Sequence, residues 1–341
     1  MSQSQDAATP KFVPPEYNII KKLGSGQTSH VYLTSHPRLG EVSLKLPRPE
    51  LHMRPVLRRL FENEVQITLS INNTTERLRD EHVVRALEGY PTGEEAFLTL
   101  EYCPGGTLDE RLNTELLDLE YASHLILDVA KGLEYTHNRQ VLHRDVKPAN
   151  VFLTSEKRAK LGDYGTGMFM TERTSERVGT AFYMAPEIFE GKPPSVQSDV
   201  YSLGVLAYEV LTGVRPFTGD SYDALMLQHL TSVPKNIRSR RSDISAKLGA
   251  VVAQAMSRDQ NKRFKTVREF IGTYGDVTGI MPLAEARHTV KSGRATRATK
   301  SDNGPGRPAK GSAKVAPRKS GTANAKPENT RGGLFGWLKK K

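Results

Sequence analysis

One short run of the chain brings together an acid, a base and an amide: His143-Arg144-Asp145-Val146-Lys147-Pro148-Ala149-Asn150. Asp145 can orient an incoming hydroxyl group and accept its proton, Lys147 can neutralise a phosphate in transfer, and Asn150 can offer an oxygen to a magnesium ion. A polar surface loop with a hydrogen-bonded histidine would explain any one of these residues, but it does not explain the ordered set. The run therefore indicates phosphoryl transfer to a hydroxyl group.

A second oxygen ligand lies further along the chain, in the run Asp163-Tyr164-Gly165. Mg²⁺ prefers such hard oxygen groups because it requires a compact, oxygen-rich coordination shell. Asn150 and Asp163 are therefore the predicted metal ligands, and Mn²⁺ is the alternative ion.

Small residues at Gly24, Ser25 and Gly26 lie between two predicted strands, ahead of Val31. At such a place, backbone amides can approach a phosphate closely. Taken alone, the glycines are about three times better explained by an ordinary hairpin turn than by a phosphate-binding loop. They favour phosphate binding only together with the other motifs.

A lysine and a glutamate complete the set of charged groups. Lys45 ends the run Val42-Ser43-Leu44-Lys45, and Glu64 follows 19 residues later on a predicted helix. An ion pair between them can aim an ammonium group at phosphates, although most surface pairs of this kind are solvated and contribute little.

The elements that must hold these groups differ between the two halves of the chain. Before Cys103 the pattern predicts mainly strands, over 16–34 (two strands around a turn), Glu41–Leu46 and Phe97–Leu100, with one helix that begins at Pro55. After Cys103 it predicts helices at Leu119–Asn138 and Val200–Leu211, and an apolar helical stripe over 244–255.

The second half also contains a predicted loop and a predicted last helix. The run from His143 to Asn150 is expected to form a loop between two short strands. Thr266 and Glu269 form a capping box for a last helix that ends at about Tyr274.

Between about residues 15 and 275 the motifs resemble, in order, those of the eukaryotic-type (Hanks-type) serine/threonine protein kinases, and the chain is similar to their bacterial members. The motifs are the glycine segment, Lys45, Glu64, the run 143–150, Asp163-Tyr164-Gly165, the segment 179–187, Asp199 and Arg263. The resemblance implies an α+β, bilobal fold with a small β-rich N-lobe (15–103) and a larger, mainly helical C-lobe (104–275). It also implies ATP as the donor, serine and threonine hydroxyls of proteins as acceptors, and autophosphorylation.

The resemblance assigns a role to each site residue. Lys45 would contact the α- and β-phosphates with Glu64 as its partner, Asp145 would be the catalytic base, and Asn150 and Asp163 would hold Mg²⁺. Leu100 would be the gatekeeper beside the adenine. Glu187 would pair with Arg263, and Asp199 would brace the catalytic loop. The implied nucleotide contacts are Leu23, Gly24, Ser25, Gly26, Gln27, Val31, Lys45, Glu101 and Cys103, the last two through their backbone.

Lys147 and Thr180 resemble the serine/threonine branch of the family. Thr180 lies in the segment that faces the acceptor, and its hydroxyl can bridge Asp145 and Lys147. The segment Ala185-Pro186-Glu187, which builds a peptide platform in the family, favours a protein substrate over a small molecule.

Two positions depart from the family pattern. Ser29 replaces the third glycine of the phosphate loop and narrows backbone freedom there. Tyr164 replaces the usual phenylalanine, so its hydroxyl needs a partner or water when the ring packs. We expect activity to survive both changes.

Arg144 beside the catalytic aspartate implies control by a phosphate on the activation segment, which runs from Asp163 to Glu187. Thr171, Thr174 and Ser175 are the candidate phosphorylation sites. Glu176 stands near the position that is often phosphorylated, so its carboxylate is expected to replace part of that phosphate's effect.

Charge divides the chain sharply. The full sequence of 341 residues has a formal charge of +11, but residues 281–341 hold 15 Lys or Arg against 3 Asp or Glu, which leaves about −1 for the rest. We expect residues 1–14 to be flexible, 276–333 to be a basic low-complexity linker in a disordered tail, and 334–341 to be a short amphipathic basic terminus. Gly306-Arg307-Pro308 resembles only part of a minor-groove hook.

The single cysteine, Cys103, excludes an intramolecular disulfide framework and fits a reducing compartment. The first residues lack the apolar core of a secretory signal, and no run is long and apolar enough to span a bilayer. A cytoplasmic protein is therefore expected, with the terminus 334–341 suited to the anionic inner face of a membrane.

Three function hypotheses remain distinct. The first is an active protein kinase. The second is a pseudokinase scaffold, which requires a broken Lys45, Asp145, Asn150 or Asp163, whereas all four are intact. The third makes the tail primary, as a polyanion or nucleic-acid binder with an attached kinase, and salt-dependent DNA binding would distinguish it. Substrates and oligomeric state stay open.

Overall fold

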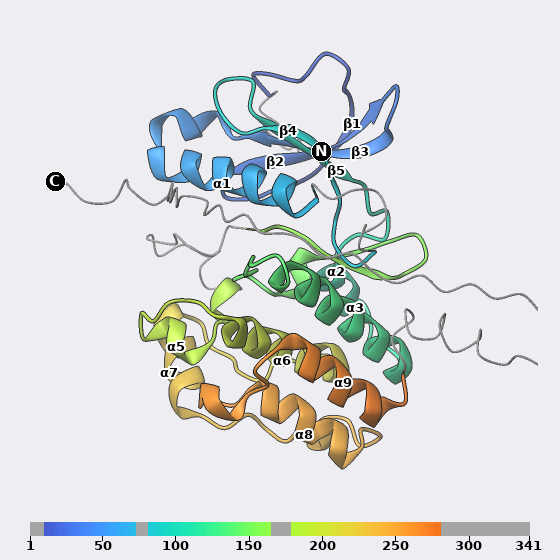
Figure 1. The fold of residues 1–341 in the computed structure, drawn as a ribbon, viewed down its shortest axis with the longest axis vertical. Coiled ribbons are helices and arrows are strands. Elements are labelled where there is room, and N and C mark those ends of the chain that lie inside the picture. The colour runs from blue at the N-terminus through green and yellow to red at the C-terminus, as the bar shows by residue number, and fades with distance from the viewer. Residues whose placement is uncertain (1–9, 73–80, 165–178, 281–341) are drawn as a thin grey trace, which may run out of the picture. The chain divides into compact units, whose positions relative to one another are not determined.

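The computed structural model describes residues 10–72, 81–164 and 179–280. Within these ranges a five-stranded sheet with one long helix precedes a group of helices, and a two-stranded sheet lies between them (Figure 1). The predicted α+β fold, with a small β-rich lobe followed by a larger helical lobe, is confirmed.

The N-terminal sheet is antiparallel throughout, in the order β1-β2-β3-β5-β4. Its strands are β1 Asn18–Ser25, β2 Ser29–His36, β3 Gly40–Pro47, β4 Ala86–Tyr90 and β5 Phe97–Glu101. The register places Gly24 opposite Val31 and Val31 opposite Lys45. Since directly opposed residues share a face of a sheet, these three predicted nucleotide contacts lie in one row on one face.

One helix covers this part of the fold. After the short 3₁₀ segment η1 (Pro49–Met53), α1 runs over Pro55–Asn72 with Pro55 as its first residue, where the missing N–H costs no helical hydrogen bond. Phe61 and Val65 of α1 are buried against Leu98 and Leu100 of β5. This packing fixes the face of α1 that carries Glu64.

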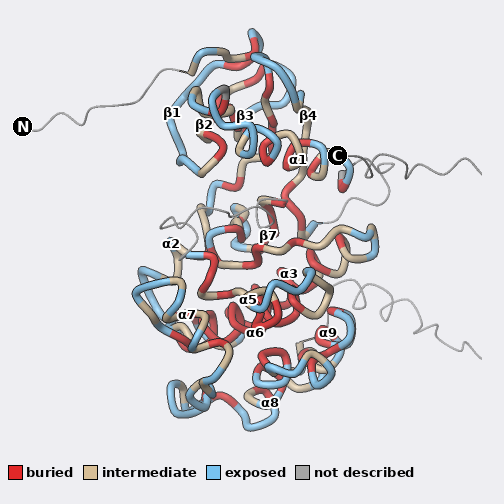
Figure 2. Tube along the Cα trace, turned by 90° about the vertical axis from the view of Figure 1, so that its left-hand side faces the viewer, coloured by how far each residue is buried: buried red, intermediate tan, exposed pale blue. Residues whose placement is uncertain are grey.

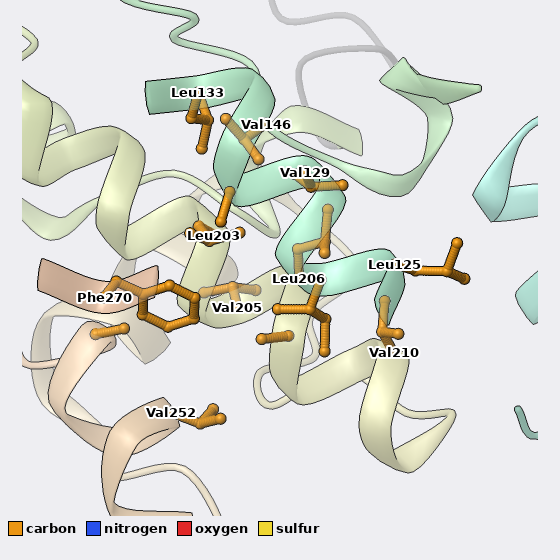
Figure 3. Packing of buried hydrophobic residues seen from close by; sticks show 14 of the residues in the cluster. Leu125, Val129, Leu133, Val146, Leu203, Val205, Leu206, Val210, Val252 and Phe270 are labelled. Carbon is orange, nitrogen blue, oxygen red and sulfur yellow. The ribbon is translucent and has the colours of Figure 1, made fainter. Parts of the chain in front are cut away.

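The second lobe is built around a fully buried helix. Fifteen of the 17 residues of α6 (Val196–Thr212) are buried, as expected for a helix that is apolar all round. It packs against α3 (Leu119–His137), α8 (Ala246–Ala255) and α9 (Val267–Thr278) (Figure 2). Figure 3 shows Leu203 and Leu206 of α6 among Leu125 and Val129 of α3.

The remaining elements are α2 Leu108–Leu112, η3 Pro148–Asn150, β6 Val151–Leu153, β7 Ala159–Leu161, α5 Pro186–Phe189, α7 Tyr222–Thr231, η5 Ile237–Ser239 and η6 Gln260–Lys262.

Local signals begin and end α6. The hydroxyl of Ser195 accepts a hydrogen bond from the amide of Ser198, whose hydroxyl accepts in return from the amide of Ser195. This reciprocal cap satisfies two otherwise unpaired donors. Gly213 ends the helix in a left-handed conformation, with φ 72°. Asp199 is thereby held in the first turn of a rigid helix.

The sequence reasoning was wrong at three boundaries. β4 was not predicted, and it gains its place by pairing with β5. No strand precedes His143, because Val141 donates its amide back to Thr136 at the end of α3 and not to a neighbouring strand. Helix α9 continues past Tyr274 to Thr278, where Gly279 (φ 71°) ends it.

The predicted capping box of α9 forms only in part. Thr266 accepts the amide of Glu269 at 3.2 Å, but the Glu269 carboxylate accepts the amide of Lys265 and not that of Thr266. Across the ranges that the structure covers, no helix combines the length and apolarity required to cross a membrane.

Candidate active site

The loop 143–150 is suspended from Asp199, which is 1% exposed. One carboxylate oxygen of Asp199 accepts the amide of Arg144 at 2.8 Å, and the other accepts the amide of His143 and contacts Nε2 of His137, both at 2.8 Å. Arg144 has a left-handed backbone with φ 68°, which costs free energy in a residue with a side chain. The buried carboxylate at the start of α6 holds this strained turn, as the resemblance implied.

His143 links the loop to the segment before Asp163. Its Nε2 lies 2.9 Å from the carbonyl of Gly162, and its Nδ1 accepts the amide of Asp145 at 3.3 Å. Because the Gly162 carbonyl can only accept, the proton of the neutral ring is assigned to Nε2. Burial lowers the pKa of His143, so the ring is neutral at physiological pH and serves as a spacer between two chain segments.

Three of the predicted catalytic groups meet around Asp145. The ammonium of Lys147 lies 2.8 Å from Oδ2 of Asp145 and donates to Oγ1 of Thr180 at 3.0 Å. Thr180 in turn donates to Oδ1 of Asp145 at 3.0 Å. The structure thus closes the triangle that the sequence suggested, between residues 35 positions apart in the chain.

Asn150 is fixed against the same aspartate. Its Nδ2 donates to the backbone carbonyl of Asp145 at 2.8 Å and to Oδ2 at 2.9 Å. Both amide donors are therefore used on Asp145, and Oδ1 is the atom of Asn150 left to face a cation.

Lys45 lies between two carboxylates. Its ammonium donates to Glu64 at 2.6 Å and also contacts Asp163, a bond that the sequence reasoning did not anticipate. Lys45 and Glu64 are 6% and 1% exposed, whereas 27% of the Asp163 side chain is exposed. Asp163 has φ 61°, another left-handed residue next to the reacting groups.

Opposing effects set the charges of this group. Burial favours a neutral Lys45, but the carboxylates of Asp163 and Glu64 outweigh it and raise the pKa of the ammonium. Burial likewise opposes ionisation of Asp163, yet the Lys45 charge lowers the pKa of that carboxyl group. Burial raises the pKa of Glu64. We take Lys45 and Asp163 as charged, because each charge stabilises the other at contact distance.

The oxygen atoms of Asn150 and Asp163 suit a divalent ion that keeps further ligands of its own. Among the residues that the structure covers, no three or more His, Cys, Asp or Glu side chains gather in a way that could enclose a metal. Asn150 and Asp163 supply one amide oxygen and one carboxylate. Such a partial oxygen set fits Mg²⁺, which usually retains waters and binds substrate phosphates.

The glycine segment is open to a ligand. A Cβ atom added at Gly24 would have no atom of the chain within 4 Å, and at Gly26 only the carbonyl of Ser29 at 4.0 Å. Neither glycine has a positive φ. Packing and backbone conformation within the protein therefore do not require glycine at either position, which favours close approach of a ligand as the reason.

The loop between β1 and β2 is closed by Ser29, the departure from the family pattern. Its carbonyl accepts the amide of Gly26 at 2.8 Å. Ser25 contacts Nδ1 of His30 at 2.9 Å, while Leu23 is exposed at the same edge of β1. Gln27 lies in the turn itself. The backbone carbonyl of Ser29 thus closes the turn, and survival of activity with this serine stays a prediction.

The connection between the lobes carries the predicted adenine contacts. Leu100 is buried with Cys103, and burial raises the pKa of the Cys103 thiol to about 12, so the thiol stays protonated. The carboxylate of Glu101 accepts two contacts from Lys160 at 2.7 and 2.8 Å and the amide of Arg85 at 2.7 Å. Lys160 was not predicted. It lies 59 residues away, and its spacing gives no signal of this contact.

Two further groups of charged side chains follow Thr180 in the chain. Arg263 holds Glu187 through two bonds of 2.7 and 2.8 Å, as the resemblance implied. Tyr183 donates to Glu209 at 2.5 Å, and Arg215 donates to the same carboxylate at 3.1 Å. Sequence reasoning missed Glu209 and Arg215, since both lie in a segment that predicts only a helix and its end.

Tyr164 is fully buried, with its ring centroid 4.7 Å from that of His143 and the two rings tilted by 59°, and its hydroxyl donates to the carbonyl of Leu161 at 3.3 Å. The expected partner for this hydroxyl is therefore present. Thr171, Thr174, Ser175 and Glu176 lie outside the described residues, as do the tail from 281 onward and the first nine residues.

The comparisons with known proteins agree with this geometry. Residues 17–272 match the protein kinase domain family. The chain is 32% identical to serine/threonine-protein kinase PknB of Mycolicibacterium smegmatis over 274 residues, which is 76% of the chain and 43% of that protein. It is also 32% identical to PknB of Mycobacterium tuberculosis over 273 residues (76% of the chain, 42% of the relative).

A probable serine/threonine-protein kinase of Streptomyces coelicolor is 32% identical over 277 residues, again 76% of the chain and 39% of the relative. The chain thus spans about two fifths of the length of the curated relatives it matches. The matched range includes every residue of the candidate site, from Leu23 to Thr180. On this match the chain belongs to the protein kinase domain family, and the relatives named above are serine/threonine kinases of bacteria.

Proposed function

We propose that the chain is a serine/threonine protein kinase that transfers the γ-phosphoryl group of ATP to hydroxyl groups of proteins. The observation that carries the proposal is the contact triangle of Asp145, Lys147 and Thr180. It places a carboxylate, a cation and a hydroxyl within 3.0 Å of one another, next to the amide of Asn150. A pseudokinase is not favoured by any of these contacts.

The acceptor hydroxyl would be oriented by Asp145, which takes its proton as the new oxygen–phosphorus bond forms and the bond to the leaving phosphate breaks. Lys147 lies where negative charge develops on the transferring group. Thr180 holds the carboxylate and the ammonium in register, so less reorganisation is needed during the reaction. Catalysis of this kind depends on positioning and charge.

The nucleotide would lie along the row Gly24, Val31 and Lys45, with its adenine at the backbone of Glu101 and Cys103. The open space at Gly24 and the exposed edge of β1 support this placement. Lys45, held by Glu64, would neutralise the α- and β-phosphates. Family membership implies ATP and a divalent ion, and we propose Mg²⁺, with Mn²⁺ as a substitute, held by Asn150 and Asp163. The ion would supply charge neutralisation of the phosphates.

Radiolabelled transfer tests the proposal directly. The purified full chain is incubated with [γ-³²P]ATP and a mixture of casein and histone, and the labelled residues are identified by phosphoamino-acid analysis. We expect phosphoserine and phosphothreonine without phosphotyrosine. We also expect no transfer in excess EDTA and recovery with Mg²⁺ or Mn²⁺. ATP binding without transfer would favour the scaffold alternative, and a majority of phosphotyrosine would contradict the assignment to serine and threonine.

We further propose a cytoplasmic protein whose terminus 334–341 contacts an anionic membrane surface. The support is its sequence, which joins Leu334, Phe335, Trp337 and Leu338 to three lysines. Cosedimentation with vesicles of phosphatidylglycerol and phosphatidylcholine should fall when residues 334–341 are deleted. Equal sedimentation of the two proteins would remove the membrane proposal, and binding to DNA that falls steeply with salt would favour a polyanion partner instead.

A further inference from the structure

A large groove lies far from the candidate site, along α8, the helix farthest from the N-terminal sheet in Figure 1. Its volume is about 540 Å³, within the range of sites that bind ligands. It runs between α8, the end of α6 and the segment 232–238 that follows α7. None of the residues assigned to phosphoryl transfer lines it.

The base of the groove is formed by side chains of the helical core. Phe217, Ile237, Val252 and Met256 line it but are at most 5% exposed. The apolar surface that stays accessible lies on the walls of the groove, where Val233 is 79% exposed and Ala250 and Ala253 of α8 are also exposed. The groove therefore offers apolar surface that the protein itself does not cover within the described residues.

The rim is positively charged. Lys235, Arg238 and Arg258 line the groove, and none of its described lining residues is Asp or Glu. Arg238 donates to the carbonyl of Ile244 at 3.1 Å and Arg258 to that of Leu230 at 3.0 Å. Each guanidinium group is thus fixed in place while further N–H groups remain to bind a carboxylate.

The positive charge is concentrated in the part of the sequence that forms the groove. Residues 232–262 hold seven Lys or Arg against two Asp, although the chain before residue 281 is close to neutral overall. Basic side chains beside exposed apolar walls are complementary to a segment that carries acidic and apolar side chains together. The groove is less suited to a polyanion without apolar groups, since such a ligand would leave the apolar walls exposed to water.

We propose that this groove is a docking site for a peptide segment of a protein partner in which Asp or Glu side chains flank apolar side chains. The apolar side chains bind the walls formed by Val233, Ala250 and Ala253, and the carboxylates bind Lys235, Arg238 and Arg258. The docking does not depend on phosphoryl transfer, so its test measures binding alone.

The probe is a random 12-residue peptide library displayed on phage and selected on the full chain. Enriched peptides are synthesised with fluorescein, and their Kd values are measured by fluorescence anisotropy. We expect enriched sequences to place Asp or Glu beside Leu, Ile, Phe or Met. Absence of enrichment, or enriched peptides lacking either class of residue, would overturn the proposal.

Two matched pairs of variants locate the binding. Ala253→Glu places a carboxylate in the groove, while Gln254→Glu adds the same charge at the next exposed position of α8, outside it. Lys235→Glu reverses a charge on the rim, and Lys247→Glu makes the same reversal on α8 away from the groove. All four chains keep the basic tail, so any binding of acidic peptides by the tail is common to them.

We expect Ala253→Glu and Lys235→Glu to weaken binding about tenfold or more, the effect of losing one central contact. Gln254→Glu and Lys247→Glu should bind like each other and close to the unmodified chain. The melting temperature of each variant shows whether it is folded. Should Ala253→Glu be unfolded, the comparison of Lys235→Glu with Lys247→Glu tests the proposal by itself. Equal binding within each pair, or equal affinity for a peptide of glutamate alone, would overturn the proposal.

Discussion

Replacing Asp145 with alanine should lower kcat for phosphoryl transfer about 10²- to 10⁴-fold, the range for loss of a general base. The carboxylate is 6% exposed and contacts Lys147 and Thr180, so no nearby group can take over its position. The KM for ATP should change little, because Asp145 is not among the predicted nucleotide contacts. Initial rates with [γ-³²P]ATP at varied concentration measure both quantities.

Two further variants make this result specific. Asp145→Asn keeps the size of the side chain but removes its charge and basicity, so its loss of kcat should match that of alanine. Asp276→Ala removes an exposed carboxylate from α9 and should leave kcat unchanged. An Asp145→Ala protein that retains more than about a tenth of the rate would show that Asp145 is not the base.

Replacing Glu187 with alanine should lower the free energy of unfolding by about 3–5 kcal/mol, the cost of breaking a buried ion pair by removing one partner. Arg263 is 2% exposed and Glu187 3%. Without Glu187 the guanidinium group would stay buried, held by the carbonyls of Ser257, Gln197 and Arg258 and by the ring of Tyr201, and none of these groups neutralises its charge. Urea unfolding followed by circular dichroism measures the change.

An exposed pair provides the control for the buried one. Arg268 donates to Glu134 at 2.5 Å, but its side chain is 79% exposed, so Arg268→Ala should change stability little. The combined variant Glu187→Gln with Arg263→Met should lose less than the two single changes add up to, since it leaves no unpaired buried charge. Strict additivity, or equal losses at the buried and exposed pairs, would contradict this account.

Much of the site follows from short runs of sequence. The loop 143–150 orders an acid, a cation and an amide within eight residues, and a local turn is enough to bring Asp145, Lys147 and Asn150 together. Helix α6 could be predicted because a helix that is apolar on all sides is expected to lie buried in a core. Residue type alone suggested an ion pair of Lys45 with Glu64 and an oxygen ligand at Asp163. The resemblance to a family was needed to combine these groups into one site, because their separations in the chain carry no local geometry.

Element boundaries were less predictable. Strand β4 has weak β propensity of its own, and pairing with β5 and packing against α1 decide its existence. The run before His143 is apolar but meets no partner strand, so hydrophobicity alone gave the wrong element there. In both cases the presence or absence of a partner strand determined the outcome.

Side-chain type and local periodicity were enough to predict which chemical groups are present, their order and most of the helices and strands that carry them. The fold, and not any local run, brings Lys45 to Asp163, Lys160 to Glu101 and Tyr183 to Glu209, and places the basic segment 232–238 beside an apolar groove. Each of these contacts joins segments whose approach is set by core packing and strand register. No local pattern specifies that packing in advance.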